Sequence, residues 1–569
     1  MRSLRNLSKK PISFSPSALL ITCVILSGLI YLTIYTVPFP LSRFFDTIPP
    51  VDYTKLTQYS PKGFWLYVVG IIALFSLYIW AIRISMPGRS HDNEPILLPL
   101  SPNRVETGGT RAGPASTDPE PRSDRAGGQQ PGNIRRPVSS KQVGRDTSAI
   151  AGRAVIWASA VLALILIFAY PLTAIDLFIY AIRTRGWGLY NLQPLSTPPE
   201  ALPRSDPWLG LAGEWIDAAS PYGPLWEGLS LGAFYLSGGD LLPHLFALKI
   251  IGGLAYLGCT WLIFDILRQT QPDWAIAGAI AFAWNPLVLF ESVLNAHNDI
   301  VMALFLLAAI WVFVQMDQRR SGVNASLLAL LFCVLVTMSI LVKFVTIIIV
   351  PFFLLPVAMQ QPTWSRRIGT LALYGSIVLA LVFLSMALFW PGLENWALLE
   401  TGRQAGRSLL ALLVLSLRDV VGTNTAFDVS RTLIMTIFAG IYLYFLWQTF
   451  TKVRPNSQTP SFVPLACSAA FFVLFWYVLL AGPVFHAWYL LWFLPLAVLL
   501  LPKTTPLIIA VVFSLTALLI IPYFETIRVW YPALLRNHLA GHLIGVPLLI
   551  LPPLLVLLWS IRPGNSSEV

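Results

Sequence analysis

The sequence predicts an all-α protein that crosses a lipid bilayer many times. Hydrophobic residues make up 56% of the 569 residues and charged residues only 11%, a composition that would leave the surface of a soluble domain insoluble. Many apolar runs reach the length of about 20 residues that crosses roughly 30 Å of hydrocarbon. Lys and Arg recur at alternate turns, so the net charge of +11 indicates membrane topology rather than nucleic-acid binding.

We expect about 14 spans, with both chain termini in the cytoplasm. Basic residues between Arg2 and Lys10 precede the first apolar run and keep the N-terminus inside. Two spans, 18–36 and 63–82, form an N-terminal extension, residues 1–85. The main body, residues 149–569, carries the other expected spans at 150–171, 241–267, 274–293, 300–314, 325–342, 344–359, 368–390, 432–450, 462–480, 488–501, 507–523 and 542–560.

Residues 86–148 differ in composition from the rest of the chain. They are rich in Pro, Gly, Ser, Arg and Asp and contain no Phe, Trp or Tyr. Such a segment buries too little apolar surface to offset the entropy lost on ordering. We therefore expect a disordered cytoplasmic linker, either a passive tether or a basic segment that touches anionic lipids.

The cysteines give no sign of a disulfide framework or a metal site. All four lie inside apolar runs, which favours free packing thiols: Cys23, Cys259, Cys333 and Cys467. The sequence holds no Walker A or HExxH pattern and no strand followed by GxGxxG. We therefore expect no protein-bound metal and no cofactor.

The longest expected outer loop, residues 173–226, begins with a carboxylate directly after a span. Asp176, Tyr180 and Arg183 are spaced i, i+4 and i+7, so they share one face of a helix that ends near Gly186. On that face we expect Tyr180 and Arg183 to orient the Asp176 carboxylate by hydrogen bonding. This pattern predicts an amphipathic helix on the bilayer surface, with the acid pointing away from the lipid. A solvated interfacial helix with an incidental Asp is the alternative.

Other polar residues of this apolar chain fall at the same outer face of the predicted topology. They are Asn285, Glu291, Asn295, His297, Asn298, Asp299, Lys343, Arg403, Arg407, Arg418, Asp419, His486, Trp488, Tyr489, Tyr523, Glu525, Arg528, Tyr531 and Arg536. Structural roles stay open for several: Asn285 at a proline kink, Trp488 and Tyr489 as interface aromatics, Asp299 as a helix cap. Lys343 has little room to snorkel, whereas Lys249, within a span, is either a buried partner or a snorkelling residue.

Outer carboxylates combined with outer cations suit the transfer of a group from a phosphate to a hydroxyl. A general base takes the proton of an acceptor hydroxyl, and cations receive the phosphate leaving group. We predict that Lys343 and at least one of Arg403 and Arg407 hold that phosphate. Nucleotide sugars are not normally present on this side of the membrane, so the donor is expected to be lipid-linked.

From about residue 150 onward the chain resembles the GT-C superfamily of multi-spanning glycosyltransferases, and most of all the bacterial polyprenol-phosphate-mannose-dependent mannosyltransferases. The resemblance rests on the order and common outer placement of several short motifs. These are Asp176 with Tyr180, Pro221-Tyr222-Gly223-Pro224-Leu225, Asn285-Pro286, His297-Asn298-Asp299, Lys343, and Trp488-Tyr489-Leu490 with Trp492 and Pro495.

The resemblance implies an inverting glycosyltransferase in the plasma membrane, with its active site on the extracytoplasmic face. The expected donor is a polyprenyl-phosphate sugar, with mannose foremost, and the acceptor is a glycan or glycolipid; the first-loop acid, here Asp176, is the expected base. Whether Asp299, Glu214 or Asp217 shares that role stays open. Expected substrate-binding residues are Tyr180, Arg183, Tyr222, His297, Asn298, Asp299, Lys343, Arg403, Arg407, His486, Trp488 and Tyr489.

A lipid-linked-glycan flippase or a secondary transporter is the alternative function. A transporter would show internal repeats and broken helices with ion sites near the midplane of the bilayer. The sequence shows no clear repeat, and its charges gather at the outer ends of the spans. A non-catalytic membrane scaffold remains a further alternative.

Overall fold

The computed structural model describes residues 15–87, 140–318, 323–387, 389–390, 392, 404–453 and 461–562. Within these ranges the chain is helical, and extended segments pair only at two isolated bridges, Pro40 with Ala169 and Gly406 with Val484. The all-α class is therefore confirmed. Most of the predicted linker lies outside the described residues, although its last residues already belong to the helix that begins at Ser140. The division of the chain into three segments stays a prediction.

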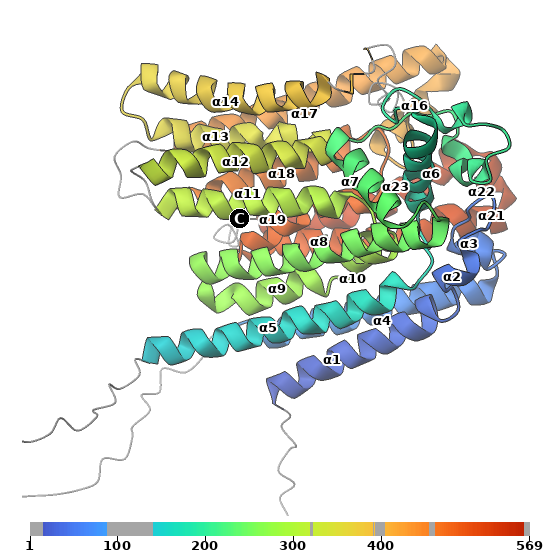
Figure 1. Ribbon diagram of the computed structural model, residues 1–569, viewed down its shortest axis with the longest axis horizontal. Coiled ribbons are helices and arrows are strands. Elements are labelled where there is room, and N and C mark those ends of the chain that lie inside the picture. Colours follow the sequence, from blue (N-terminus) through green and yellow to red (C-terminus); the bar gives the residue numbers. More distant parts are fainter. Residues whose placement is uncertain are drawn as a thin grey trace, which may run out of the picture. The chain divides into compact units, whose positions relative to one another are not determined.

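The described part contains 11 helices that are long and apolar enough to cross a membrane (Figure 1). Their bounds are α1 (Pro16–Ile30, extended by a π-helical turn at Tyr31–Thr36), α4 (Pro61–Ser85), α5 (Ser140–Ile167), α8 (Leu241–Thr270), α11 (Asp299–Gln318), α12 (Val323–Val342), α14 (Trp364–Ala387), α17 (Thr423–Lys452), α18 (Val463–Trp476), α20 (Thr504–Pro522) and α23 (His538–Ser560). Residues up to Met86 and from Ala151 onward form one compact unit.

The expected count of about 14 spans is not confirmed, and the difference lies in three places. α9 (Ala275–Ala283) and α10 (Pro286–Leu289) form a pair bent by 55°, so that the count reaches 12 if they are one span. The apolar helices Phe344–Met359 and Ala487–Leu499 are shorter than a full span. Both short helices begin at predicted site residues, directly after Lys343 and His486.

The bend between α9 and α10 has a local cause. Pro286 cannot donate a backbone hydrogen bond to the preceding turn. Asn285 caps the new helix, its Oδ1 accepting from the Leu287 amide at 2.9 Å, and it is fully buried. The structural reading of Asn285-Pro286 is therefore confirmed.

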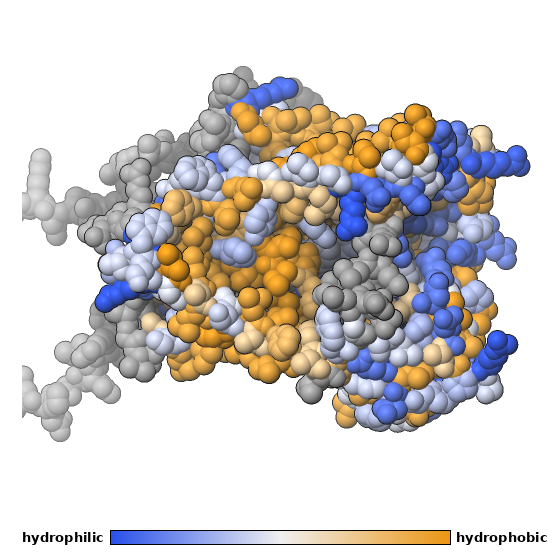
Figure 2. Space-filling model, turned by 90° about the horizontal axis from the view of Figure 1, so that it is seen from above, coloured by the Kyte–Doolittle hydropathy of each residue, from blue (hydrophilic) through white to orange (hydrophobic). Residues whose placement is uncertain are grey.

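The outer helices present their apolar side chains outward, as a lipid-facing surface does. Phe383 of α14 and Trp447 of α17 are 72% and 63% exposed. Figure 2 shows hydrophobic residues in a broad band across this face, with hydrophilic residues gathered at its right-hand end. A surface this apolar indicates contact with hydrocarbon.

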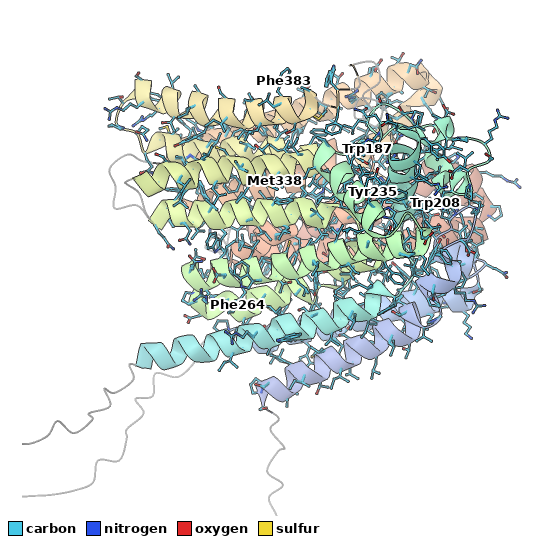
Figure 3. All side chains as sticks on the ribbon, viewed as in Figure 1. Trp187, Trp208, Tyr235, Phe264, Met338 and Phe383 are labelled. Atoms are coloured by element: carbon cyan, nitrogen blue, oxygen red, sulfur yellow. The ribbon has the colours of Figure 1, made fainter. Side chains whose placement is uncertain are left out.

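The short elements gather at one end of the bundle, on the right in Figure 1. They are α2 (Leu41–Phe44), α3 (Tyr53–Leu56), α6 (Asp176–Tyr190), α7 (Pro224–Leu236), α16 (Leu409–Val421), α21 (Arg528–Trp530) and α22 (Pro532–Arg536). Trp187, Trp208 and Tyr235 lie at this end, whereas Phe264 and Phe383 lie along the spans (Figure 3). Further π-helical turns, Phe290–Leu294, Tyr477–Ala481 and Tyr523–Ile527, follow α10, α18 and α20.

The N-terminal extension packs against the main body through buried tyrosines. The Tyr67 hydroxyl donates to the Leu518 carbonyl at 3.3 Å, and the Tyr78 hydroxyl donates to the Ala281 carbonyl. The Tyr35 ring meets the Phe290 ring edge-on, with centroids 5.0 Å apart. Hydrogen bonds satisfied inside an apolar core fix the register of the packed helices, so α1 and α4 are integral parts of the bundle.

Candidate active site

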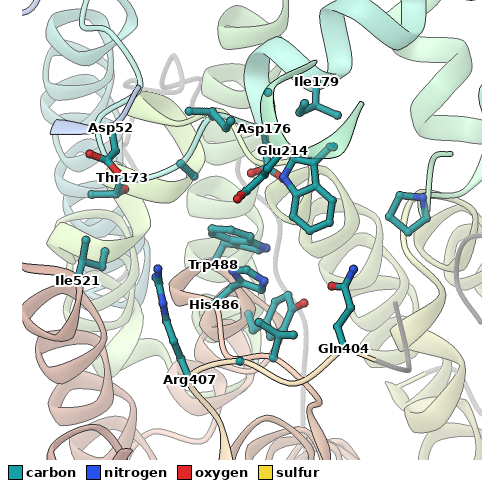
Figure 4. A pocket seen from close by; sticks show the side chains of 18 of the residues that line it. Asp52, Thr173, Asp176, Ile179, Glu214, Gln404, Arg407, His486, Trp488 and Ile521 are labelled. Carbon is teal, nitrogen blue, oxygen red and sulfur yellow. The ribbon is translucent and has the colours of Figure 1, made fainter. Parts of the chain in front are cut away.

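A cavity of about 1760 Å³ opens at the end of the bundle where the short elements gather (Figure 4). Its walls come from the segment 48–57, the start of α6, the loop 213–222, the segment 343–348, the loop 404–410, one turn of α17, the segment 481–492 and the turn 521–526. Most of the predicted site residues are brought together here. The cavity is lined by Asp176, Arg183, Tyr222, Lys343, Arg407, His486, Trp488 and Tyr489.

Asp176 is the first residue of α6, and its partly buried carboxylate faces the cavity. The Tyr222 hydroxyl donates to Asp176 Oδ1 at 3.0 Å. Burial raises the pKa of Tyr222 well above its usual value, so the phenol keeps its proton and acts as a donor. Among the described residues Asp176 forms no ion pair. The carboxylate is thus oriented by a neutral hydrogen-bond donor.

Two expectations about α6 are wrong. The helix does not lie on the bilayer with one polar face, because the residues from Leu177 to Thr184 are all buried within the protein. Tyr180 and Arg183 do not hydrogen-bond Asp176. Tyr180 packs its ring edge-on against Tyr222 and Trp226, with centroids 5.4 and 4.9 Å apart, so it supports the residue that orients the acid.

Arg183 anchors the loop that leads to Tyr222. Its Nη2 donates to the carbonyls of Ala218 and Ala219 at 3.0 and 3.1 Å. The neighbouring Ser220 hydroxyl donates to the Glu227 carboxylate. These bonds fix the backbone on the approach to Tyr222, a role that spacing along α6 alone does not reveal.

Gly223 explains the Pro-Tyr-Gly-Pro motif. A Cβ at this position would lie 2.0 Å from the Leu341 carbonyl oxygen, and the Gly223 amide donates to the Val342 carbonyl at 3.1 Å. The turn therefore presses its backbone against the last turn of α12, which only glycine permits. This contact brings Tyr222 beside Lys343.

Lys343 lies at the centre of a charged and aromatic cluster. Its Nζ lies 2.7 Å from Asp299 Oδ1, and that oxygen also accepts a hydrogen bond from the Trp492 indole. The ammonium lies 5.3 to 5.6 Å from the ring centroids of Tyr222, Tyr489 and Trp492, the range of a cation–π contact. Asp299 is fully buried and does not line the cavity.

Three rings form a stack across the floor of the site. Trp488 lies between His297 and His486, with ring centroids 3.9 and 4.2 Å apart and interplanar angles of 21° and 18°. Burial and the nearby charges of Arg407 and Lys343 lower the pKa of His486 well below its usual value, so its imidazole is neutral at physiological pH. Trp488 and Tyr489 thus line the cavity rather than a membrane interface.

Arg407 reaches the cavity from a second loop. Its guanidinium pairs with the Glu525 carboxylate, and its backbone has φ of 51°, a conformation costly for a residue other than glycine. The loop is held by hydrogen bonds from the Gly406 amide to the Pro483 carbonyl and from the Phe485 amide to the Gly406 carbonyl. Arg407 and His486 consequently share one wall (Figure 4).

Beneath the cavity a buried polar network joins residues 172–173, which precede α6, to residues 291–295, which precede α11. Asn295 Oδ1 accepts from the Leu172 and Thr173 amides, and its Nδ2 donates to Glu291 at 3.0 Å. Lys249 is fully buried and donates to the Ala169 carbonyl at 2.8 Å and to the Leu294 carbonyl. Lys249 is therefore a buried structural partner and does not snorkel.

Several predicted substrate-binding residues do not line the cavity. Tyr180, His297, Asn298 and Asp299 are buried beneath its walls, and Arg403 lies outside the described residues. Glu214 lines the cavity close to Asp176, whereas Asp217 is exposed and lies outside the lining. The cavity is also lined by Asp52, Gln404 and Arg431, which no sequence motif marks, and by Glu525, which the sequence places in the last outer loop.

Within the described ranges, no group of three or more His, Cys, Asp or Glu side chains is arranged to hold a metal ion. The four cysteines are free and buried, which confirms their expected packing role.

Residues 136–359, from the approach to α5 to the end of α13 (Val350–Met359), match the family model described as alpha-(1->6)-mannopyranosyltransferase, N-terminal domain. The matched segment contains Asp176, Tyr222, Asp299 and Lys343. Over these residues the match confirms the resemblance to mannosyltransferases that the sequence motifs indicate. A search of curated proteins found no match.

Solved structures show distant similarity. ArnT from Cupriavidus metallidurans, bound to undecaprenyl phosphate, has 14% identity over 74% of this chain and 76% of that chain, with a TM-score of 0.38. The Archaeoglobus fulgidus oligosaccharyltransferase AglB, in complex with an inhibitory peptide and a dolichol-phosphate, has 11% identity over 71% of this chain, with a TM-score of 0.35. The chain spans 55% of the length of that oligosaccharyltransferase.

Proposed function

We propose that this protein is an inverting mannosyltransferase that uses a polyprenyl-phosphate mannose and acts on a glycan or glycolipid outside the cytoplasm. The observation that carries the proposal is the position of Asp176. Its carboxylate, oriented by the Tyr222 phenol, faces a cavity whose other walls present the cations of Lys343 and Arg407. A base, a space for substrate and cations for a leaving group therefore face one another.

In the proposed reaction the acceptor oxygen forms a bond to C1 of mannose while Asp176 takes the proton of that hydroxyl. The bond between C1 and the phosphate oxygen breaks, and its electron pair leaves with polyprenyl phosphate. One displacement inverts C1, so an α-linked product, the kind named for the matched family, requires a β-linked donor. A positioned general base contributes about 10²–10⁴-fold in rate.

One flank of the cavity suits the hydrocarbon part of the donor. It is lined by Phe344, Val345 and Ile348, which follow Lys343, and by Ile434 and Met435 of α17. Apolar surface removed from water contributes about 25 cal/mol per Å², so a polyprenyl chain binds here more readily than a sugar does.

A second depression, with a more polar lining, adjoins this flank along α17. It is lined by Asp428, Thr432 and Thr436 among others, and it shares Arg431 and Met435 with the main cavity. α17 is largely exposed on its outer side, which is consistent with entry of the lipid from the bilayer.

Lys343 and Arg407 are the proposed phosphate-binding residues at the inner end of the apolar flank. Each is paired with a carboxylate in the absence of substrate, Lys343 with Asp299 and Arg407 with Glu525. Arg can grip a phosphate through two N–H groups, while Lys supplies a compact charge. The paired carboxylates hold both cations in position before the donor arrives.

In the proposed orientation the cavity opens on the extracytoplasmic side of the membrane, and both termini lie on the cytoplasmic side. α4, α8 and α17 begin at the cavity end and carry Arg83, Arg268 and Lys452 in their last turns. Helices of 25 to 30 residues at 1.5 Å per residue put those basic residues about 40 Å from the cavity end. Excess Lys and Arg at one end is typical of the cytoplasmic side.

A transfer assay with purified full-length protein tests the proposal. The donor is a short-chain polyprenyl-phosphate mannose and the acceptor is an octyl α-mannoside, with NMR of the product to assign the new linkage. An α-linked product from a β-linked donor is expected. Retention at C1, or transfer from a nucleotide sugar alone, contradicts the proposal, and movement of lipid-linked sugar across vesicles without transfer favours a flippase.

A further inference from the structure

The N-terminal extension supplies part of the cavity wall. The segment between α1 and α4 reaches over the end of the main body, and its residues 48–55 and 57 line the cavity. Asp52 lies beside Thr173 on the approach to Asp176 (Figure 4). This part of the chain precedes the residues that match the family model.

Backbone hydrogen bonds fix this segment to the main body. The Leu41 amide donates to the Phe168 carbonyl at 2.8 Å, and the Tyr170 amide donates back to the Phe39 carbonyl at 2.8 Å. Further along, the Tyr53 amide donates to the Leu172 carbonyl at 2.7 Å. Residue 172 is only four positions before Asp176, so the segment is a fixed wall beside the proposed base.

The chemistry of this wall differs from that of the apolar flank. Besides residues 48–51, it presents Asp52, Thr54 and Lys55, and Thr173 and Glu214 line the cavity nearby. Asp52 Oδ1 accepts from the Thr54 hydroxyl at 2.6 Å and from the Lys55 amide at 3.0 Å, which holds the carboxylate in place. Carboxylates and hydroxyls match the hydrogen-bonding groups of a sugar, whereas a hydrocarbon chain has no group that can form a hydrogen bond with them.

We infer that residues 48–57 form an acceptor subsite that binds the hydroxyl groups of a neutral glycan. The inference rests on the proposed function, because the acceptor hydroxyl must reach Asp176 while the lipid donor occupies the apolar flank. Asp52 accepts hydrogen bonds from acceptor hydroxyls, and the surrounding segment sets which acceptor fits. The N-terminal extension is thus a specificity element of the enzyme.

The test compares Asp52→Asn with a matched variant of the same segment in the full-length protein. Asn caps a helix as well as Asp does, so Asp52→Asn keeps α3 (Tyr53–Leu56) and removes the charge only. Asp46→Asn is the control, because Asp46 is exposed and lies outside the cavity lining. The probes are an octyl α-1,6-linked mannobioside and a short-chain polyprenyl-phosphate mannose.

Asp52→Asn is expected to raise the KM for the mannobioside about 5–10-fold, as replacing a charged hydrogen-bond acceptor by a neutral one does. The KM for the donor should stay within about two-fold, and Asp46→Asn should match the parent. An unchanged acceptor KM, or an equal rise in donor KM, overturns the inference.

Binding of the mannobioside, followed by saturation-transfer NMR, separates this inference from the proposed function. A weaker saturation-transfer signal of the mannobioside with Asp52→Asn than with the parent supports the subsite, even if the parent has no mannosyltransferase activity. Absence of that activity contradicts the proposed function alone. Equal saturation-transfer signals of the mannobioside with the two proteins overturn the subsite.

Discussion

Asp176 and Asp299 are two carboxylates of one site with opposite surroundings. Asp176 faces the cavity and receives one hydrogen bond, from the neutral Tyr222 phenol. Asp299 is fully buried and holds the Lys343 ammonium and the Trp492 indole on a single oxygen.

The difference suits the two carboxylates to different proposed roles. Asp299 is buried and paired with the Lys343 ammonium, so it is placed to position that cation. Asp176 has a free path to substrate and no opposing cation among the described residues, which suits a general base.

Lys343→Ala should have the largest effect on stability, because it leaves the Asp299 carboxylate buried without its cation. Breaking a buried pair from one side costs about 3–5 kcal/mol. The thermal unfolding of detergent-solubilised protein should shift down strongly. Donor use should fall far more than acceptor use in any protein that survives.

The double variant Lys343→Met with Asp299→Asn serves as its control. Removing both charges should restore most of the lost stability but not the use of donor, because the phosphate still lacks its cation. An unaltered melting temperature in Lys343→Ala, or full donor use in the double variant, would show that Asp299 and Lys343 do not act as described.

Tyr222→Phe should come next in size, with a loss of turnover of about 10–100-fold and little change in either KM. The variant removes the hydrogen bond that orients Asp176, and a bond to a charged group contributes about 1.5–3 kcal/mol. Tyr235→Phe is the matched control, since Tyr235 is 61% exposed on α7 and lies outside the cavity lining. Equal turnover in the two variants would remove Tyr222 from the account.

The smallest expected effect concerns pH and His486. Burial lowers the pKa of His486, and the nearby charges of Arg407, Lys343 and His297 lower it further. Below about pH 6.5, His486 therefore takes up a proton in the unfolded chain but stays neutral in the folded protein. Stability therefore falls as pH drops through this range, by about 1 kcal/mol at pH 5.5.

His486→Gln cannot take up that proton in either state. Its melting temperature should fall less than that of the parent between pH 7.5 and pH 5.5. Parallel pH curves for the two proteins would mean that His486 is not held neutral.

The sequence predicts the helical class and much of the site because both follow from local patterns. Apolar length and basic turns define spans, and polar residues at their outer ends are rare enough to be noticed, as with Asp176 and Lys343. The shortened helices after Lys343 and His486 were expected as full spans, because an apolar run does not reveal where the backbone first turns helical.

The remaining features depend on contacts between distant segments. Spacing along α6 suggested Tyr180 and Arg183 as partners of Asp176, but the partner is Tyr222, 46 residues away. The close packing of Gly223 depends on where α12 lies in the fold. The position of Asp52 depends on the pairing of residues 39–53 with residues 168–172. No local pattern encodes these distances.

The proposed base is tested most directly by turnover of Asp176→Asn compared with Asp217→Asn, an exposed acid of the same loop outside the cavity lining. Asn keeps the size and much of the hydrogen bonding of Asp but cannot take a proton. Turnover of Asp176→Asn should fall by about 10²-fold or more with donor binding and melting temperature preserved, while Asp217→Asn stays within a few-fold of the parent. Near-parental turnover in well-folded Asp176→Asn would contradict the proposed role of Asp176 and move the base to Glu214, which also lines the cavity.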